Sequence, residues 1–368
     1  MKLTALGKPE LLTRISAILV DAQRLFHQLD GPNLSSAKKT YLDKLIDFPT
    51  LKAGFSNSGT DMPEKELLEL FTAMDVSKDG HIDYLDWLSF MDPMDLTMGP
   101  LTQYFEEGPL TDSEKTKLMN MISRLERLAA AAAKQGVRLM VDAEQTYMQP
   151  AIDHLVLNLQ RQYNTKEGVI FNTFQCYLKD SEVRISIDME RAKREEFKFA
   201  CKLVRGAYMV QERKRAKDLS YPDPIHDNIE ITHINYNNMV QLLLSNNNMA
   251  EFMVASHNEQ SVQHTVQLMN MKHIPKNGGG VYFGQLLGMS DPVSFTLGHF
   301  GYQVYKYVPY GPIKEVLPYL IRRAEENGGL MAGVEKESTL LYQELKRRFF
   351  SLFPGSGGTT PEKVLDMK

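Results

Sequence analysis

Cysteine and tryptophan are scarce in this sequence, which has two cysteines, Cys176 and Cys201, and one tryptophan among 368 residues. Two cysteines cannot form the disulfide framework of a small secreted protein, and both lie in apolar runs where buried free thiols are common. We therefore expect free thiols and a reducing compartment. The sequence also lacks a signal-peptide pattern and any apolar run of membrane-spanning length, so we expect no segment that crosses a bilayer.

The sequence also lacks a large excess of either positive or negative charge. The chain has 42 lysines and arginines against 46 aspartates and glutamates, for a net charge of −4, and the basic residues are dispersed among acids. This distribution predicts no binding to nucleic acid. No G-x-G-x-x-G follows an expected strand and no G-x-x-x-x-G-K-[ST] occurs, so neither a Rossmann nucleotide site nor a Walker phosphate loop is supported.

From Thr111 onward, short apolar runs alternate with helical patterns. We expect helices at 112–135, 150–163, 189–200, 229–245, 261–271 and 292–299, and strands at 137–142, 169–177, 202–208, 251–257, 281–286 and 302–308. A further strand is expected at 2–6, before a helix at 9–26. Seven strands with helical crossovers are typical of parallel βαβ units. They favour a (β/α)8 TIM-type barrel that lacks one strand in this chain over an open sheet.

Composition suggests how the chain is divided. Residues 1–29 would begin the barrel, and residues 111–335 would form its remainder. The polar, acidic segment 30–110 between them would be a helical insertion. A C-terminal helix at 336–353 would precede a tail at 354–368, which lacks periodicity and is expected to be mobile.

The C-terminal helix is amphipathic and basic. Two readings stay open, packing against the barrel and contact with an anionic membrane surface. The apolar side chains are Leu340, Leu341, Leu345, Phe349 and Phe350, and the basic ones are Lys346, Arg347 and Arg348.

Polar residues stand where several expected strands end. Asp142 closes RLMVD, Tyr208 closes KLVRGAY and His257 closes FMVASH. TIM barrels build their sites at the carboxyl ends of strands, although any single such residue can also be a turn residue or helix cap. Two lysines, Lys2 and Lys202, fall inside expected strands. Such a lysine could form a Schiff base, as in a class I aldolase, or pair with an acid such as Asp142.

A strand, a turn and a helix follow one another in residues 303–327. Pro309 to Pro312 end the strand, and on the following helix Tyr319, Arg322 and Arg323 share one face. Two adjacent guanidiniums can bind a carboxylate through paired N–H donors, although arginines late in a helix often only face water. The residues alone thus predict a barrel enzyme that acts on a small carboxylate.

The acidic segment contains a loop like that of a calcium-binding EF-hand. Oxygen-bearing side chains occupy loop positions 1, 3, 5, 9 and 12, and glycine occupies position 6, as in the calcium loop. Position 12 carries aspartate, which is shorter than the usual glutamate. The loop is therefore either a Ca²⁺ site or a structural relic. Its candidate ligands are Asp75, Ser77, Asp79, Asp83 and Asp86.

Seven sequence motifs extend over almost the whole chain apart from the acidic segment and the tail. They are KLTALG at 2–7, LMVDAEQTYMQPAI at 139–152, FNTFQCYLKD at 171–180, KLVRGAYMVQER at 202–213, VASHNE at 254–259, YFGQLLGM at 282–289 and VYKYVPYG…PYLIRRAEENG at 304–328. Together they resemble the proline dehydrogenase family, especially its animal mitochondrial members. The resemblance implies FAD-dependent oxidation of L-proline to Δ1-pyrroline-5-carboxylate by hydride transfer to flavin N5. It also implies a quinone acceptor at the matrix side of the mitochondrial inner membrane.

The same resemblance implies roles for individual positions at the substrate. Asp142 would brace the pocket through the lysine and the strand tyrosine. The groups that hold the substrate carboxylate correspond to Lys2, Arg322 and Arg323, and the walls around the pyrrolidine ring correspond to Tyr208, Leu286, Tyr307 and Tyr319.

The FAD contacts correspond to Gln175, Lys202, Ser256 and His257. At Lys202 some bacterial members have arginine, so the donor near the flavin N5 differs in kind.

Two alternatives follow from the comparison with the family. A sister group that prefers trans-4-hydroxyproline is expected to carry serine where this chain has Tyr307, so hydroxyproline is the second candidate substrate. The family barrel has another strand before the one matching KLTALG. The chain is therefore expected to be a fragment or, alternatively, a non-catalytic relative with a calcium-responsive loop.

Overall fold

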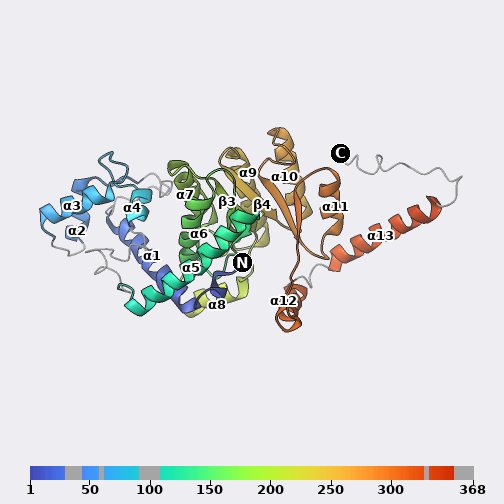
Figure 1. Ribbon diagram of the computed structural model, residues 1–368, viewed down its shortest axis with the longest axis horizontal. Coiled ribbons are helices and arrows are strands. Elements are labelled where there is room, and N and C mark those ends of the chain that lie inside the picture. Colours follow the sequence, from blue (N-terminus) through green and yellow to red (C-terminus); the bar gives the residue numbers. More distant parts are fainter. Residues whose placement is uncertain (30–43, 58–61, 91–107, 327–330, 352–368) are drawn as a thin grey trace. The chain divides into compact units, whose positions relative to one another are not determined.

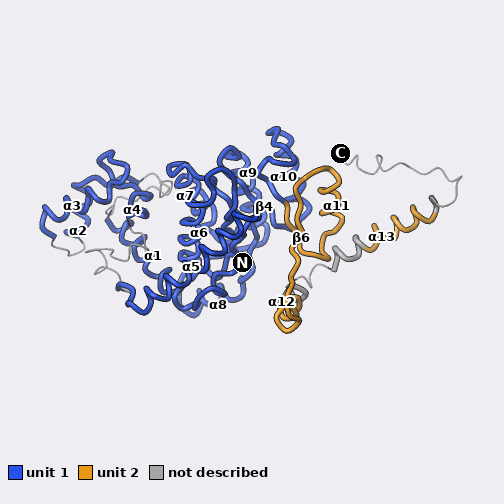
Figure 2. Tube along the Cα trace, viewed as in Figure 1, with its two compact units in different colours: residues 1–282 blue, residues 283–368 orange. Residues whose placement is uncertain are grey.

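The computed structural model describes residues 1–29, 44–57, 62–90, 108–326 and 331–351. The chain divides into two compact units, 1–282 and 283–368, which are coloured separately in Figure 2. The predicted mobile tail at 354–368 lies outside the described residues.

The described strands form one parallel sheet in the order of the chain (Figure 1). Neighbouring strands are joined by helical crossovers, as the alternation in the sequence predicts. The strands are β1 (Leu139–Met140), β2 (Ile170–Gln175), β3 (Phe199–Val204), β4 (Ala250–Ala255), β5 (Val281–Leu286) and β6 (Val304–Tyr307). The boundary between the two units falls within β5.

The sheet is curled rather than flat. The Arg138 guanidinium, just before β1, donates to the Tyr282 hydroxyl of β5 over 2.7 Å, although three strands lie between them in the sheet. Tyr282 in turn donates to Glu251 Oε2 of β4 over 2.8 Å. One apolar side chain from each of β2 to β5 packs on this inner face. The fold is thus α/β with a curled parallel half-barrel, consistent with a TIM-like barrel.

Local sequence signals explain several helix ends in the first unit. The helix expected at 112–135 has those bounds, because Thr111 and Glu114 form a capping box and Gly136 ends the helix with φ of 63°. The larger helices of this unit are α1 (Pro9–Leu29), α5 (Asp112–Gln135), α6 (Gln149–Tyr163), α7 (Ser181–Arg194), α8 (Met209–Asp218), α9 (Ile229–Ser245) and α10 (Glu259–Met271).

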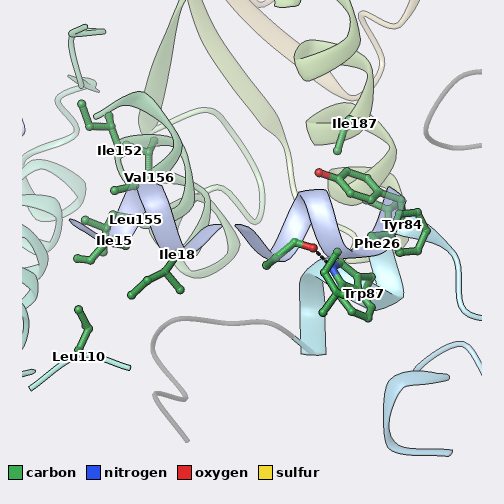
Figure 3. Close-up of a cluster of buried hydrophobic side chains, with 14 of the residues drawn as sticks. Ile15, Ile18, Phe26, Tyr84, Trp87, Leu110, Ile152, Leu155, Val156 and Ile187 are labelled. Atoms are coloured by element: carbon green, nitrogen blue, oxygen red, sulfur yellow. Dashed lines mark hydrogen bonds between the residues drawn. The ribbon is translucent and has the colours of Figure 1, made fainter. Parts of the chain in front are cut away.

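The acidic segment adds three short helices that share a core with α1. Trp87 is fully buried, its ring lies 5.6 Å from that of Phe26, and its Nε1 donates to the Ala22 carbonyl over 2.9 Å (Figure 3). Burial of such a side chain contributes about 2–3 kcal/mol. The three helices are α2 (Phe48–Asn57), α3 (Glu64–Met74) and α4 (Tyr84–Phe90). The described helices of the segment therefore pack within the first unit.

The two cysteines behave as the sequence predicts. Cys176 and Cys201 are free and fully buried. Burial raises the pKa of the Cys176 thiol to about 12, which makes it a poor nucleophile at neutral pH.

The strand expected at 2–6 is wrong. Only Met1 lies beside β1, where its amino group donates to Met140 O and its carbonyl accepts from Asp142 N. Residues 3–5 then form a short 3-10 helix. The backbone N–H and hydroxyl of Thr4 both donate to the Glu144 carboxylate, at 3.1 and 2.9 Å, so a side chain takes the place of a strand partner.

The helix expected at 189–200 is also misplaced, because α7 begins at Ser181 and ends at Arg194. Glu196 has φ of 55°, and Phe197 N donates to Ala192 O, which closes the helix with a Schellman-type turn. Glycine usually occupies that left-handed position, so a glutamate there does not signal the end of a helix. Helix α8 at 209–218 was not expected either.

The second unit contains the strand, turn and helix expected at 303–327, as β6 followed by α12 (Ile313–Glu326). Helix α11 (Asp291–His299) precedes β6, and α13 (Met331–Ser351) follows α12. No helix within the described ranges is long and apolar enough to cross a membrane.

Candidate active site

A partly buried ion pair joins β3 to the residue that follows β1. Lys202 Nζ of β3 is 2.6 Å from Asp142 Oδ1, which follows β1, and only 16% of the lysine side chain is exposed. β2 lies between the two strands, so Lys202 reaches across the inner face of the curl. Burial raises the pKa of Asp142, but the Lys202 and amino-terminal charges outweigh burial and hold that pKa below its usual range. This pairing favours the ion-pair reading of Lys202 over a Schiff-base lysine.

Lys2 lies close to this pair but has another direct partner. Its Nζ donates to the Tyr208 hydroxyl over 2.6 Å and lies 3.9 Å from Glu144 Oε2. The resemblance pairs Lys2 with Asp142 directly. In the structure, Lys2 contributes to the field that lowers the pKa of Asp142, whereas the hydrogen-bonded partner of Asp142 is Lys202. Lys2 and Tyr208 together present an ammonium beside an aromatic wall.

The end of β2 holds the turn that carries Tyr208. Gln175 is buried, and its side-chain amide accepts from Ala207 N at 3.3 Å and donates to Glu144 O at 2.9 Å. Gly206 has φ of 145°, and a Cβ added there would lie 2.6 Å from the Tyr177 ring. Only glycine fits this close approach. Contacts with Gln175 and Tyr177, at and just after the end of β2, therefore fix the conformation of this turn.

A cation without an acidic partner lies at the same edge of the sheet. The Arg205 guanidinium donates to His233 Nδ1 at 2.9 Å, to Ser256 Oγ at 2.7 Å and to Ser261 Oγ at 2.9 Å. All three groups are neutral acceptors, and no ion pair of Arg205 with a carboxylate is found in the part of the chain that the structure describes. Burial lowers the pKa of Arg205 from its ordinary value. Ser261 stands in the first turn of α10, whose N-terminal dipole also favours an anion.

In the second unit, three of the predicted pocket walls come from adjacent elements. Leu286 of β5 and Tyr307 of β6 are register partners. The rings of Tyr307 and Tyr319 of α12 lie 5.7 Å apart. Arg322 and Arg323 belong to α12, but their side chains lie outside the described part of the structure.

Comparison with known proteins gives the family. The family model described as "Proline dehydrogenase" matches residues 44–336. The chain belongs to the proline dehydrogenase family. It is 43% identical to proline dehydrogenase 1, mitochondrial, of Homo sapiens over 95% of this chain and 60% of the relative. The corresponding protein of Drosophila melanogaster is 38% identical over 95% of this chain and 53% of the relative. The chain thus spans little more than half of these curated relatives.

The chain is also similar to a hydroxyproline dehydrogenase and to a protein of known structure. Hydroxyproline dehydrogenase of Xenopus laevis is 48% identical over 66% of this chain and 53% of the relative. Among solved structures, proline utilization A from Bdellovibrio bacteriovorus, inactivated by N-propargylglycine, has a TM-score of 0.54 at 26% identity, over 58% of this chain and 22% of that one. The proline dehydrogenase family model includes most of the segment that the sequence suggests is an insertion.

Arg205, His233 and Ser261 were not among the site residues that the sequence predicted. The motif KLVRGAY contains Arg205, but its neighbours in the chain do not reveal that its partners are neutral. The available signal was a basic residue three positions before the expected end of a strand. His257, an expected FAD contact, follows β4 beside Ser256.

The calcium-like loop has the expected backbone but not a gathered ligand set. It joins α3 to α4, Gly80 has φ of 84°, and an antiparallel bridge pairs Ile82 with Ile46. The Asp75 carboxylate accepts from the backbone of Asp79 and Gly80, at 3.1 and 3.0 Å. No group of three or more His, Cys, Asp or Glu residues is placed to hold a metal ion in the described parts of the chain.

Two further acids of the loop, Asp83 and Asp86, have partners within the chain. Asp83 Oδ2 forms an ion pair with the Arg194 guanidinium of α7 at 2.6 Å. Asp86 accepts from Ser77 N at 3.2 Å and from the Ser77 hydroxyl at 3.2 Å. Burial, followed by the nearby Asp83 carboxylate, raises the pKa of Asp86. Arg194 thus supplies a positive charge to the loop from within the chain.

Proposed function

We propose that this protein oxidises L-proline to Δ1-pyrroline-5-carboxylate with FAD as its cofactor, on the matrix side of the mitochondrial inner membrane, and passes the electrons to quinone. The observation that carries the proposal is the arrangement of two lysines, Lys202 on Asp142 and Lys2 on Tyr208. Family membership and relatives named as mitochondrial proline dehydrogenases support it. We also propose that the curled sheet belongs to a (β/α)8 barrel.

The residues at the sheet edge fit FAD. Arg205 has neutral partners, so its charge is available to a pyrophosphate, and the N-terminus of α10 adds backbone dipoles. Ser256 is buried and already oriented by Arg205. Arg205 and Ser256 would hold the phosphates, whereas Gln175, Lys202 and His257 would line the flavin. When bound, FAD supplies the hydride acceptor at its N5.

The chain itself supplies binding and orientation. Lys2, Arg322 and Arg323 would hold the substrate carboxylate, which fixes the pyrrolidine ring against its walls. The family resemblance assigns Tyr208, Leu286, Tyr307 and Tyr319 to those walls. Asp142 orients Lys202 and places a negative charge beside it.

The visible spectrum of the purified chain tests the proposal directly. We expect a flavin spectrum that bleaches when L-proline is added. D-proline is the matched control, because it carries the same groups in the wrong hand. A colourless protein that cannot be reconstituted with FAD would reject the proposal and favour a non-catalytic relative.

Tyr307 is expected to make proline a better substrate than trans-4-hydroxyproline. Its ring stands beside Tyr319 and would fill the space that an additional hydroxyl needs. We expect kcat/KM for L-proline to exceed that for hydroxyproline by roughly 10- to 100-fold, the usual range for a pocket that rejects a hydroxyl. Tyr307→Ser should narrow the ratio, and Tyr310→Ser, at a side chain that is 94% exposed, serves as its control. A clear preference of the unaltered chain for hydroxyproline would make hydroxyproline dehydrogenase the better assignment.

We propose a peripheral membrane contact through α13. Its apolar side chains Leu341, Leu345 and Phe349 are spaced by four residues and are 63%, 65% and 59% exposed. Its basic side chains support the idea less, because Arg347 and Arg348 both pair with Glu344. The side chain of Phe350 lies outside the description. Co-sedimentation with cardiolipin-containing vesicles, with and without residues 338–368, tests the contact: equal binding of the two forms contradicts it.

Calcium binding by the loop at 75–86 is the second candidate function, and the helix–loop–helix backbone with its Ile46–Ile82 bridge favours it. On this hypothesis, Ca²⁺ at 100 times its Kd adds about 2.7 kcal/mol to the free energy of unfolding and raises Tm. Asp75→Asn with Asp79→Asn should abolish the shift. Absence of heat in isothermal titration of the intact chain would end the hypothesis.

A further inference from the structure

A strained turn follows β5 and begins at Leu286. Gly288 and Ser290 both have positive φ, 75° and 52°, and Ser290 immediately precedes α11. The left-handed conformation is unfavourable for serine, so the turn needs support from its surroundings. Because Leu286 opens this turn, the path of the turn sets the position of its side chain.

Lys306 of β6 provides that support. Its Nζ lies 2.7 Å from the Met289 carbonyl, 2.7 Å from Asp291 Oδ1 and 3.4 Å from the Leu286 carbonyl. Its side chain is 20% exposed. One ammonium therefore joins the start of the turn, its end and the first residue of α11.

The same lysine lies next to the residue expected to set substrate specificity. Side chains alternate along a strand, so Lys306 and Tyr307 leave β6 on opposite faces. Tyr307 is the register partner of Leu286, and its carbonyl accepts from Leu287 N at 3.0 Å. Lys306 thus contacts the turn from the face of β6 opposite to that of Tyr307.

We infer that Lys306 is a positioning residue for the substrate pocket, one that fixes Leu286 relative to Tyr307 by holding the turn at 286–291. The inference rests on the proposed function, since Leu286 is a pocket wall only if the protein binds proline. Removal of the ammonium takes away the donor shared by two carbonyls and a carboxylate, and the turn must then relax. A shift of about 1 Å in a positioning contact can cost up to ~100-fold in rate or binding.

The test is the Lys306→Met variant, which keeps the length of the side chain and removes its charge. We expect KM for L-proline to rise about tenfold, with kcat, flavin content and the midpoint of thermal unfolding close to those of the unaltered chain. Lys306→Arg should recover part of the loss. Lys193→Met, at an exposed lysine paired with Glu190, is the matched control and should change nothing.

A double-variant cycle separates positioning from general stability. In a Leu286→Ala background, Lys306→Met should change KM by less than about twofold, because the side chain through which it acts is gone. Unchanged KM in the single variant, or a full tenfold effect in the Leu286→Ala background, would overturn the inference. If the unaltered chain itself fails to respond to proline, the proposed function and this inference fall together; a responsive chain with an unaffected Lys306→Met variant overturns the inference alone.

Discussion

Asp142→Asn is expected to lower kcat/KM for L-proline by roughly 30- to 1,000-fold, equivalent to about 2–4 kcal/mol. The substitution keeps the size of the side chain but leaves the ammonium of Lys202, which is 16% exposed, without its counter-charge 2.6 Å away. An unpaired charge in such a place is costly. Because Lys202 is an expected flavin contact, we also expect weaker FAD retention. Steady-state kinetics and the ratio of flavin to protein absorbance measure both effects.

The matched control is Asp218→Asn. Asp218 also pairs with a lysine, Lys214, but on the surface of α8, where the two side chains are 53% and 73% exposed. Ion pairs on the surface contribute about 0–1 kcal/mol to stability, so Asp218→Asn should lower kcat/KM by less than about fivefold. The double variant Asp142→Asn/Lys202→Met removes both charges and should recover thermal stability without recovering activity. Wild-type kinetics in Asp142→Asn would contradict the role given to the pair.

Arg322→Ala is expected to raise KM for L-proline by roughly 10- to 150-fold, with flavin content retained. Hydrogen bonds to a charged group contribute about 1.5–3 kcal/mol, and a guanidinium can donate two of them to one carboxylate. The residue belongs to α12, about one turn before the helix ends. Steady-state kinetics over a wide range of proline concentrations measure the change.

Two further variants sharpen this prediction. Arg322→Lys keeps the charge but not the planar fork, so it should recover only part of the loss. Arg348→Ala, at a guanidinium that is 73% exposed and paired with Glu344 in its own helix, should leave KM unchanged. Normal proline kinetics in Arg322→Ala would contradict the proposed binding of the substrate carboxylate by Arg322 and, with it, the assignment of proline as substrate.

Sequence reasoning succeeded where a local signal determines the structure. The bounds of α5 follow from Thr111, Glu114 and Gly136, each of which acts within one turn of the helix end. The pairing of Lys202 with Asp142 was one of two alternatives that followed from the positions of these residues in the expected strands. Asp142 stands at a strand end, and a lysine inside a parallel strand must face either the interior or the helices.

The sequence was misleading where a distant group determines the outcome. Thr4 leaves the strand conformation because Glu144, 140 residues away, takes its hydrogen bonds. The importance of Arg205 depends on His233 and Ser261, which come from two other helices. The early start of α7 was hidden because Val183 to Asp188 alternate β-branched and polar side chains, a pattern that suits a strand as well as a helix. Such tertiary partners leave no mark in a local window.

The link from Arg138 through Tyr282 to Glu251 has a consequence for the order in which the protein assembles. Arg138 and Tyr282 are separated by 144 residues in the chain, so the loop that their hydrogen bond closes is among the longest in the first unit. Contacts this distant in sequence slow folding, because the entropy of loop closure opposes them before they form. During synthesis, β1 to β4 are made before Tyr282. Until β5 follows, the inner face with Phe171 and Met253 lacks its cover, and exposed apolar surface of this kind favours aggregation.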